Sequence, residues 1–314
     1  MGHDRHTMAV FAPALYLTVT VELSSSGNDE VHIHPAGQGF WIARMLKHLG
    51  ERPLLCGPLG GESGRVIRGL LGQFGMDASI VDVAYRSPVI VSDRRSGDRE
   101  LIAQSPPVTL ERHEIDDMYG RLLEKAMGSE LCVITGQSDE IFPIDFYQRL
   151  GHDLEAGGVR VVADLHGPEL KAFLEGGPVE ILKVSDEDLA EDGLLDVEDK
   201  TTHVRALESL AEAGARSLVL SRQDKPALIR LRDGWFEART PELHPADHRG
   251  AGDSMTAGLA TGLRRGMTEE ETIRLACAAG AANVTRHGLG SADEGLIPGL
   301  AEKVEITPIS PAPV

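Results

Sequence analysis

The sequence predicts an α/β protein with a central, mainly parallel sheet and a small β appendage. From residue 108 onward, segments with helical spacing alternate with short apolar runs. Continuous apolar runs are typical of strands that are buried on both faces, and helices between such strands favour parallel pairing. Short strand-like segments before residue 104 predict the appendage. The alternating elements are helix 111–128, strand 131–134, helix 144–156, strand 159–163, helix 201–213 and strand 217–220.

The length and charge of the chain limit its function. The 314 residues include 31 Lys and Arg against 49 Asp and Glu, a formal net charge of −18. Single cores stop growing near ~250–300 residues, so the length alone fits one large domain or two small ones. With the fold class above, we expect one domain over 1–314. The negative charge disfavours nucleic-acid and membrane-surface binding, because both partners are polyanions. The Arg pairs at 94–95 and 264–265 are too isolated to form a basic patch.

The three cysteines and the N-terminal segment predict a cytoplasmic protein. Cys56, Cys132 and Cys277 are far apart and lie among apolar residues, which is typical of buried thiols in a reducing compartment. The apolar stretch 9–21 contains Pro13 and is shorter than the ~18–20 residues of a spanning helix. The N-terminus lacks the cationic start and cleavage site of a signal peptide.

The first predicted element is a strand over 16–22, where polar and apolar residues alternate. Residues 24–28 break it, and residues 31–34 alternate again. Segment 80–103 is also strand-like, with a hairpin turn at Ser96-Gly97-Asp98. Together, 16–34 and 80–103 form the predicted appendage.

Two glycine turns lead into helices. Ala36-Gly37-Gln38-Gly39 precedes apolar residues at helical spacing, and that helix ends at Gly50. A strand over 53–56 runs into a glycine-rich loop over 57–64, and a second helical pattern continues to Gly75.

The last third of the chain is predicted to be helical from 251 to about 286. Thr268 and Glu271 have the three-residue spacing of a capping box. Residues 306–314 contain several prolines, and we expect a loose tail there.

The segment from Asp247 to Gly258 carries the clearest chemistry. Gly250, Ala251 and Gly252 let the backbone approach a ligand, and the N–H groups of the following helix form an anion site. Asp253 would repel a bound phosphate, but it makes sense as the base for a hydroxyl that attacks that phosphate. A simple helix cap is an equally good reading of Asp253 from its residue type alone.

The surrounding residues resemble the ribokinase-like (PfkB) carbohydrate kinases. The second signature of that family reads D-T-x-G-A-G-D before a helix of small residues, and Gly250-Ala251-Gly252-Asp253 is similar to its end. The following Ser254-Met255 looks most like the branch of 1-phosphofructokinase and tagatose-6-phosphate kinase. The resemblance implies a ribokinase-like three-layer fold in which the β appendage is a lid over the substrate.

Four other sites agree with the family in chain order. Residues 36–50 match the first signature, G-G-K-G-x-N-x-A-R, and residues 57–64 match the glycine loop that follows it. Residues 135–147 match S-G-S-L-P and D-F-Y. Residues 164–170 match D-x-S-G-x-x-L, and Lys183 matches the Lys of K-P-N-x-x-E-L. Agreement at five ordered sites covers most of the chain.

The resemblance implies a role for each residue that stands at a functional position of the family motifs. Asp253 would be the catalytic base, and the amides of Gly250, Ala251 and Gly252 would hold the transferring phosphoryl group. The implied nucleotide contacts are Lys183, Ser221, Ala279 and Asn283. Asp188 either contacts Mg²⁺ through a water or is an ordinary acidic residue at a helix start. The implied substrate contacts are Ser24, Gly37, Gln38, Gly39 and Arg86. ATP and Mg²⁺ are the implied cofactors, and pairing of the lid between subunits implies a homodimer.

The chain also departs from the family motifs. The substrate-side N-P-A-x-D is placed on residues 20–24, so that Ser24 replaces the sugar-binding Asp. Gln38 and Trp41 replace the Lys and Asn of G-G-K-G-x-N, whereas Arg86 still matches T-R-I-N-x-K. On the nucleotide side, N-x-x-E reads Ser185-Asp186-Glu187-Asp188.

We therefore predict an ATP-dependent kinase that phosphorylates a hydroxyl of a sugar or sugar phosphate. The alternative is a ligand-binding or regulatory member of the same fold with weakened catalysis. A Walker P-loop is excluded, because the chain has no Gly-Lys dipeptide. His32 and His34 share a strand face and either bind a metal or are surface polar residues. Phe40 and Trp41 either stack on a substrate ring or pack in the core.

Overall fold

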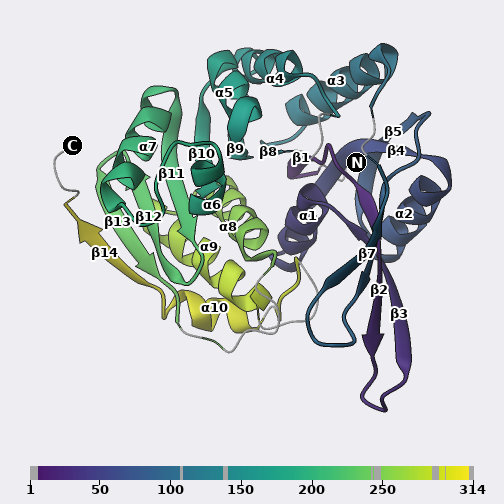
Figure 1. Cartoon of the computed structure of the whole chain (residues 1–314). Helices are drawn as coiled ribbons and strands as arrows, with labels where there is room; N and C mark the ends of the chain where they lie inside the picture. Colours follow the sequence, from purple (N-terminus) through teal and green to yellow (C-terminus); the bar gives the residue numbers. More distant parts are fainter. Residues whose placement is uncertain are drawn as a thin grey trace, which may run out of the picture.

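The computed structural model of the chain confirms the α/β fold, with a large mixed sheet between helices and a separate small sheet (Figure 1). It describes residues 6–106, 109–136, 141–241, 243, 249–284, 290–293 and 295–310. The strands are β1 (Met8–Phe11), β2 (Tyr16–Leu23), β3 (Asp29–Ala36), β4 (Pro53–Gly60), β5 (Asp77–Val83), β6 (Val89–Asp93), β7 (Glu100–Gln104), β8 (Leu131–Thr135), β9 (Val161–Asp164), β10 (Val179–Ser185), β11 (Ala215–Arg222), β12 (Lys225–Leu231), β13 (Gly234–Arg239) and β14 (Glu305–Ile309). The helices are α1 (Gln38–His48), α2 (Gly61–Gln73), α3 (Arg112–Met127), α4 (Ile144–Ala156), α5 (Gly167–Gly176), α6 (Asp186–Glu191), α7 (Lys200–Glu212), α8 (Ala251–Arg265), α9 (Glu269–Val284) and α10 (Leu296–Ala301).

The large sheet has the strand order β14-β13-β12-β11-β10-β9-β8-β1-β4-β5. All pairs from β11 to β5 are parallel. The remaining strands, β12, β13 and β14, extend the sheet in antiparallel pairs. In an open parallel sheet, ligands bind beyond the carboxyl ends of the strands, and polar residues end β8, β9 and β10.

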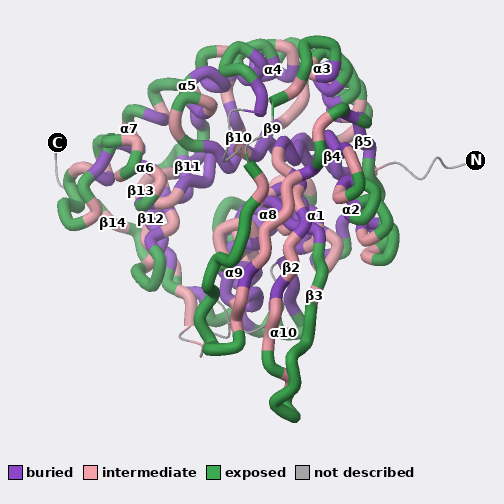
Figure 2. The backbone as a smooth tube through the Cα atoms, turned by 45° about the vertical axis from the view of Figure 1, so that its right-hand side comes forward, coloured by how far each residue is buried: buried purple, intermediate pink, exposed green. Residues whose placement is uncertain are grey.

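Two apolar layers hold helices on the two faces of this sheet. Buried residues of α1, α2, α8, α9 and α10 form one layer, and those of α3, α4, α5 and α7 form the other. The central strands are accordingly buried along their length (Figure 2). No helix among the described residues is long and apolar enough to cross a membrane.

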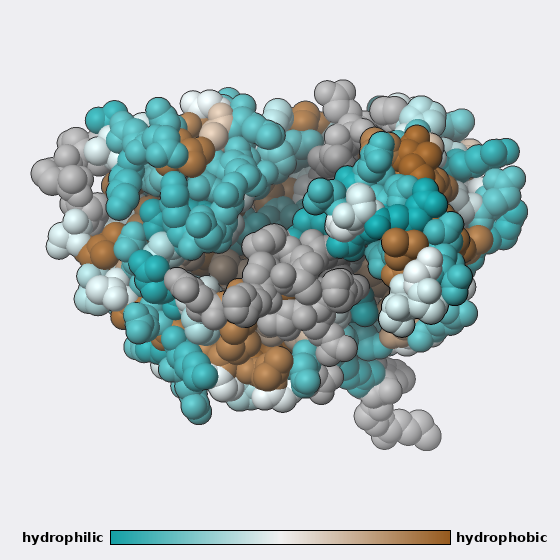
Figure 3. Space-filling model, turned by 60° about the horizontal axis from the view of Figure 1, so that its bottom comes forward, coloured by the Kyte–Doolittle hydropathy of each residue, from teal (hydrophilic) through white to brown (hydrophobic). Residues whose placement is uncertain are grey.

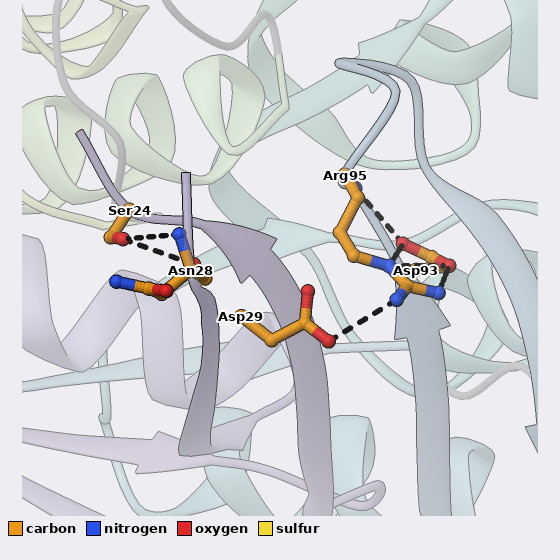
Figure 4. Close-up of polar contacts among 5 residues, drawn as sticks. All are labelled: Ser24, Asn28, Asp29, Asp93 and Arg95. Atoms are coloured by element: carbon orange, nitrogen blue, oxygen red, sulfur yellow. Dashed lines mark hydrogen bonds and ion pairs between the residues drawn. The ribbon is translucent and has the colours of Figure 1, made fainter. Parts of the chain in front are cut away.

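The small sheet projects from the body and has the strand order β3-β2-β6-β7 (Figure 1). Four residues join β1 to β2, and Gly37 alone separates β3 from α1. The two hairpins of the small sheet, β2–β3 and β6–β7, turn where the sequence predicts turns, and Gly27 and Gly97 in these turns have positive φ. Arg95 pairs with Asp93 and with Asp29 and so ties the two hairpins together (Figure 4).

Three predicted boundaries are wrong. The sequence predicts the first strand at 16–22, but the first strand is β1. All four residues of β1 are buried, so polar and apolar residues do not alternate in it. Residues 77–83 pair with β4 in the large sheet, so only residues from 89 onward of the predicted segment 80–103 belong to the small sheet. Residues 305–309 are not a loose tail but the edge strand β14, where Pro308 is tolerated because one side of an edge strand has no partner.

Gly37 makes a sharp prediction for stability. Its φ is 125°, and a Cβ at this position would lie 2.1 Å from the carbonyl oxygen of Ala14. Gly27 in the β2–β3 turn also has a positive φ, of 79°, but no atom lies within 4 Å of its Cβ position. We expect Gly37→Ala to lower the free energy of unfolding by about 3 kcal/mol or more, and Gly27→Ala by about 1–2 kcal/mol. Urea unfolding measures both, and equal losses would contradict the prediction.

Candidate active site

The predicted catalytic segment lies at the start of α8, above the carboxyl ends of the parallel strands. Gly250 adopts the left-handed conformation, with φ 75°, and precedes the first helical residue, Ala251. The N–H groups of the first turn of a helix have no partner within the helix, so they can bind an anion. Asp247 and His248 of this segment lie outside the described residues.

Gly252 lies in close contact with Lys183. A Cβ on Gly252 would lie 2.7 Å from the Lys183 Nζ atom. Lys183 lies near the end of β10 and is 6% exposed. Its ammonium is therefore held directly beneath the first turn of α8, where its charge adds to the positive end of the helix.

Lys183 lies among carboxylates. Its Nζ atom is 3.4 Å from Oδ1 of Asp164, which ends β9, and Thr256 of α8 donates a 2.6 Å hydrogen bond to Oδ2 of the same carboxylate. Burial lowers the pKa of the Lys183 ammonium, but the surrounding carboxylates outweigh burial and raise its pKa overall. Lys183 is therefore positively charged at neutral pH.

Asp253 is half-buried in this cluster, and its proton affinity is unusual. Burial, followed by repulsion from Asp164, raises the pKa of Asp253 from 3.8 to about 7. The charge of Lys183 and a hydrogen bond from Gln38 lower this pKa and offset part of the rise. A carboxyl with a pKa near 7 can both accept and release a proton at physiological pH.

Gln38 joins α1 to the end of β8. Its Oε1 atom accepts a hydrogen bond from the Gly136 N–H at 3.2 Å, and its side chain also hydrogen-bonds Asp253. Gly37 and Gly39, by contrast, are buried against residues 12–14, where a Cβ on Gly39 would lie 2.6 Å from that of Ala12. Of the predicted substrate residues in this turn, Gln38 is the one whose side chain reaches the catalytic segment, whereas Gly37 and Gly39 could contact a substrate only through their backbone.

A pocket of about 730 Å³ opens between the small sheet, α1 and the start of α8. The lining from β2 and β3 is mostly polar, because Thr18, Thr20, Glu22, His32 and His34 share one face, whereas β6 and β7 add the apolar Ile90 and Leu101. Arg44, Arg94, Arg99 and Arg249 add positive charge, and Tyr16 and Trp41 add aromatic surface.

The structure shows where two residue pairs with alternative interpretations lie. His32 and His34 are stacked, with ring centroids 6.1 Å apart, and line the pocket. No set of three or more metal-ligating side chains occurs among the described residues. Phe40 is a core residue at 1% exposure, whereas Trp41 is partly exposed to the pocket.

Two predicted substrate residues lie elsewhere. Ser24 is in the turn at the tip of the β2–β3 hairpin, where its hydroxyl donates to the Asn28 carbonyl at 3.0 Å and accepts from the Asn28 N–H at 3.1 Å (Figure 4). Arg86 is on the surface, with a side chain that is 79% exposed and 3.2 Å from Glu62. Neither residue is in the lining described above.

The motif placement explains the error at Ser24. The segment Ala12-Pro13-Ala14-Leu15-Tyr16 directly follows β1 and matches the P-A of N-P-A-x-D. Tyr16, not Ser24, therefore stands at the position of the motif's Asp, and Tyr16 lines the pocket. The sequence signal for Tyr16 is the Pro13-Ala14 pair, which directly follows the unpredicted strand β1.

The predicted nucleotide residues divide into two groups. Ser221 ends β11 beside Ser185, and its hydroxyl donates to the Val184 carbonyl at 3.3 Å. Asp188 lies in the first turn of α6, where Oδ2 accepts a 2.5 Å hydrogen bond from Ser185. Both lie at the same edge of the sheet as Lys183.

Ala279 and Asn283 instead support the start of α8 from within α9. Ala279 is fully buried, so its side chain is not available to an adenine ring. Asn283 is 1% exposed, and its amide donates to the Arg249 carbonyl at 2.7 Å and accepts from the Gly290 N–H at 2.8 Å. The expectation that residues 279–283 lie beside the adenine stays a prediction, and any such contact by Ala279 would involve its backbone.

Asp164 and Thr256 are site residues that the sequence analysis did not assign. The signal for Asp164 was a charged residue directly after an apolar strand. Thr256 gave no such signal, because a threonine one turn into a helix is ordinary. Gln137 and Ser138, which carry part of the family resemblance, lie outside the described residues.

Comparison with known proteins identifies the family to which this α/β fold belongs. The model of the pfkB family of carbohydrate kinases matches residues 10–294. The chain belongs to this family and is therefore a carbohydrate kinase, which transfers a phosphoryl group to an alcohol group.

Named relatives and solved structures agree with this assignment. The chain is 24% identical to 1-phosphofructokinase of Bacillus subtilis over 87% of this chain and 88% of the relative. It is 25% identical to ATP-dependent 6-phosphofructokinase isozyme 2 of Mycobacterium tuberculosis over 91% and 86%. The structure of phosphofructokinase-2 from Escherichia coli superimposes with a TM-score of 0.85 at 21% identity, covering 95% of this chain and 99% of the other, which shows the same fold.

Proposed function

We propose that this chain is an ATP-dependent kinase for a phosphorylated sugar, with Asp253 as the catalytic base. The observation that carries this proposal is the position of Asp253. Its carboxyl, whose pKa is raised to about 7, lies in the first turn of a helix whose free N–H groups can hold a phosphate.

The residues suggest the following transfer. The γ-phosphoryl group of ATP lies against the N–H groups around Gly250, Ala251 and Gly252, above the Lys183 ammonium. Asp253 takes the proton from the acceptor hydroxyl as its oxygen forms a bond to phosphorus. The bond from phosphorus to the β-phosphate oxygen breaks, and ADP leaves. Positioning and charge stabilisation supply most of the rate in such reactions.

The pocket supports a phosphorylated acceptor. It contains four arginines against one carboxylate, Glu22, which is 3.5 Å from Arg94. This local charge is opposite to the net charge of the chain. The relatives named above are phosphofructokinases, which supports a fructose phosphate or a similar sugar phosphate as the acceptor.

Nucleotide and magnesium contacts are proposed at the edge formed by β10 and β11. Mg²⁺ is commonly held by one or two carboxylates, waters and the phosphates of the nucleotide. Asp188 fits this role, because Ser185 occupies only Oδ2 of its carboxylate in the hydrogen bonds given above. The ion would supply charge neutralisation between the phosphates. Ser221 is proposed to lie beside the nucleotide.

A coupled assay of ADP release over sugars, sugar phosphates and nucleosides tests the function. We expect turnover with at least one sugar phosphate and much less with the matching unphosphorylated sugar. If no acceptor supports ADP release, although the chain binds one of them, the catalytically weakened alternative is correct instead. Preference for an unphosphorylated sugar would contradict the proposed acceptor class.

The small sheet is proposed to be the lid of this pocket and the contact surface of a homodimer. His32 and His34 face the pocket, so Val31 and Ile33 of the same strand point to the opposite side. That outer side is apolar and exposed, with Val31 at 61% and Ile33 at 46% exposure. In the space-filling view, separate apolar spots interrupt the hydrophilic surface on the right-hand side (Figure 3).

The dimer proposal predicts a change in molecular mass. We expect the wild-type chain to sediment as a dimer at micromolar concentration, and Val31→Asp combined with Ile33→Asp to sediment as a monomer. Leu194→Asp is the control, because Leu194 is 50% exposed outside the small sheet. A monomeric wild-type chain would contradict the proposal.

A cytoplasmic location is also proposed, since Cys56, Cys132 and Cys277 are free and buried.

A further inference from the structure

Tyr16 lies where the base of the small sheet meets α1. It is the first residue of β2 and pairs with Ala36, two residues before Gln38. Its ring is half-buried and meets the Trp41 indole edge-on, with centroids 6.2 Å apart and planes at 85°. Tyr16 therefore connects the base of the small sheet to the helix that carries Gln38.

The surroundings of the phenol place it beside the proposed reacting groups. Tyr16 and Gly250 line the same pocket. Burial, followed by repulsion from Asp253, raises the pKa of Tyr16 to about 12, while Arg99 and Arg249 act in the opposite direction. The hydroxyl is thus protonated at neutral pH and lies in the field of one carboxylate and two guanidinium groups.

An aromatic wall at this point has consequences for the shape of the acceptor. An aromatic ring packs well against the carbon face of a sugar. A hydroxyl that points at the wall would lose its water without gaining a hydrogen bond, which costs free energy. The wall therefore distinguishes sugars that differ only in the direction of one hydroxyl.

We propose that Tyr16 determines acceptor specificity: its ring and Trp41 form a wall for the carbon face of the acceptor, and its hydroxyl hydrogen-bonds the acceptor beside Asp253. This inference rests on the proposed function, because it takes the pocket to be the acceptor site. It adds that one side chain selects between epimers.

The test compares two sugar phosphates that are epimers at C4, fructose 6-phosphate and tagatose 6-phosphate. Their affinities are measured by titration calorimetry without nucleotide, and their turnover is measured by ADP release. The variants are Tyr16→Phe and Tyr16→Ala. The matched control is Tyr85→Phe, because Tyr85 packs against the apolar layer of α3, α4, α5 and α7 and is not in the pocket lining.

We expect Tyr16→Phe to weaken acceptor binding about 10-fold, the worth of one hydrogen bond. Tyr16→Ala should also change the ratio of the two affinities by about 10-fold, because the wall is gone. Tyr85→Phe should change neither. The ratio distinguishes a specificity role from a structural one, because general loosening weakens both epimers alike.

The outcomes separate this inference from the proposed function. If the ratio changes but neither sugar phosphate is phosphorylated, Tyr16 has the inferred role and the kinase proposal for this acceptor class fails. If turnover occurs and Tyr16→Ala leaves the ratio unchanged, the inference is overturned and the proposed function stands. If neither epimer binds the wild-type chain, the inference is also overturned.

Discussion

Asp253→Asn is expected to lower kcat by about 10²–10⁴-fold, the usual loss when a general base is removed. Asparagine keeps the shape of the side chain but cannot take the proton of the acceptor hydroxyl. The wild-type kcat/KM should also fall on the acid side of about pH 7, because the carboxyl is protonated below its pKa. ADP release measured over a range of substrate concentrations, at each pH from 5 to 9, gives both kcat and kcat/KM.

The same substitution is expected to stabilise the folded chain at neutral pH. The pKa of Asp253 is raised from 3.8 to about 7 on folding, so ionisation reduces stability as pH rises through this interval. Asparagine removes that loss, and the gain should vanish below about pH 4. Asp186→Asn is the control: burial also raises the pKa of Asp186, but Asp186 has no assigned catalytic role. Unchanged kcat in Asp253→Asn would refute the proposed base.

Lys183→Met is the second change with a large expected effect. Lys183 and Asp164 form a pair whose side chains are 7% and 5% exposed. Removing one partner leaves a buried carboxylate without its counter-charge, which costs about 3–5 kcal/mol. The loss of the ammonium should also raise the pKa of Asp253 further, since Lys183 lowers it. The acid side of the kcat/KM profile should therefore move above pH 7.

Lys225→Met is the matched control for this variant. Lys225 lies 3.9 Å from Glu198, but the two side chains are 47% and 88% exposed. Exposed pairs contribute about 0–1 kcal/mol, so urea unfolding should show little change. A similar loss of stability in both variants would show that burial of the Lys183 pair is not the cause.

The sequence predicted the parts of the fold that repeat a simple pattern. Helix 144–156 was predicted with its observed bounds, because its apolar spacing is regular and turn residues flank it. The capping box at Thr268 and Glu271 is also confirmed, with reciprocal hydrogen bonds of 2.9 Å and 3.2 Å. In contrast, β1 is short and wholly buried, so neither alternation nor length distinguished it.

The candidate site was predictable where a local motif carries it and not where distant segments meet. Gly250 and Asp253 were found because they are neighbours in the chain. The contact between Lys183 and Gly252 joins residues about seventy positions apart, and only the sheet register brings Lys183 beside Asp164. The misplacement at Ser24 followed from missing β1, which shifted the motif by eight residues.

The direct link between β3 and α1 has one further consequence. Because Gly37 alone separates them, any swing of the small sheet must also disturb the surroundings of Trp41, whose indole contacts Tyr16. The other tryptophan, Trp235, belongs to β13 at the far end of the large sheet. In a chain with Trp235 replaced by Phe, intrinsic fluorescence would therefore report closure over the acceptor without any added dye.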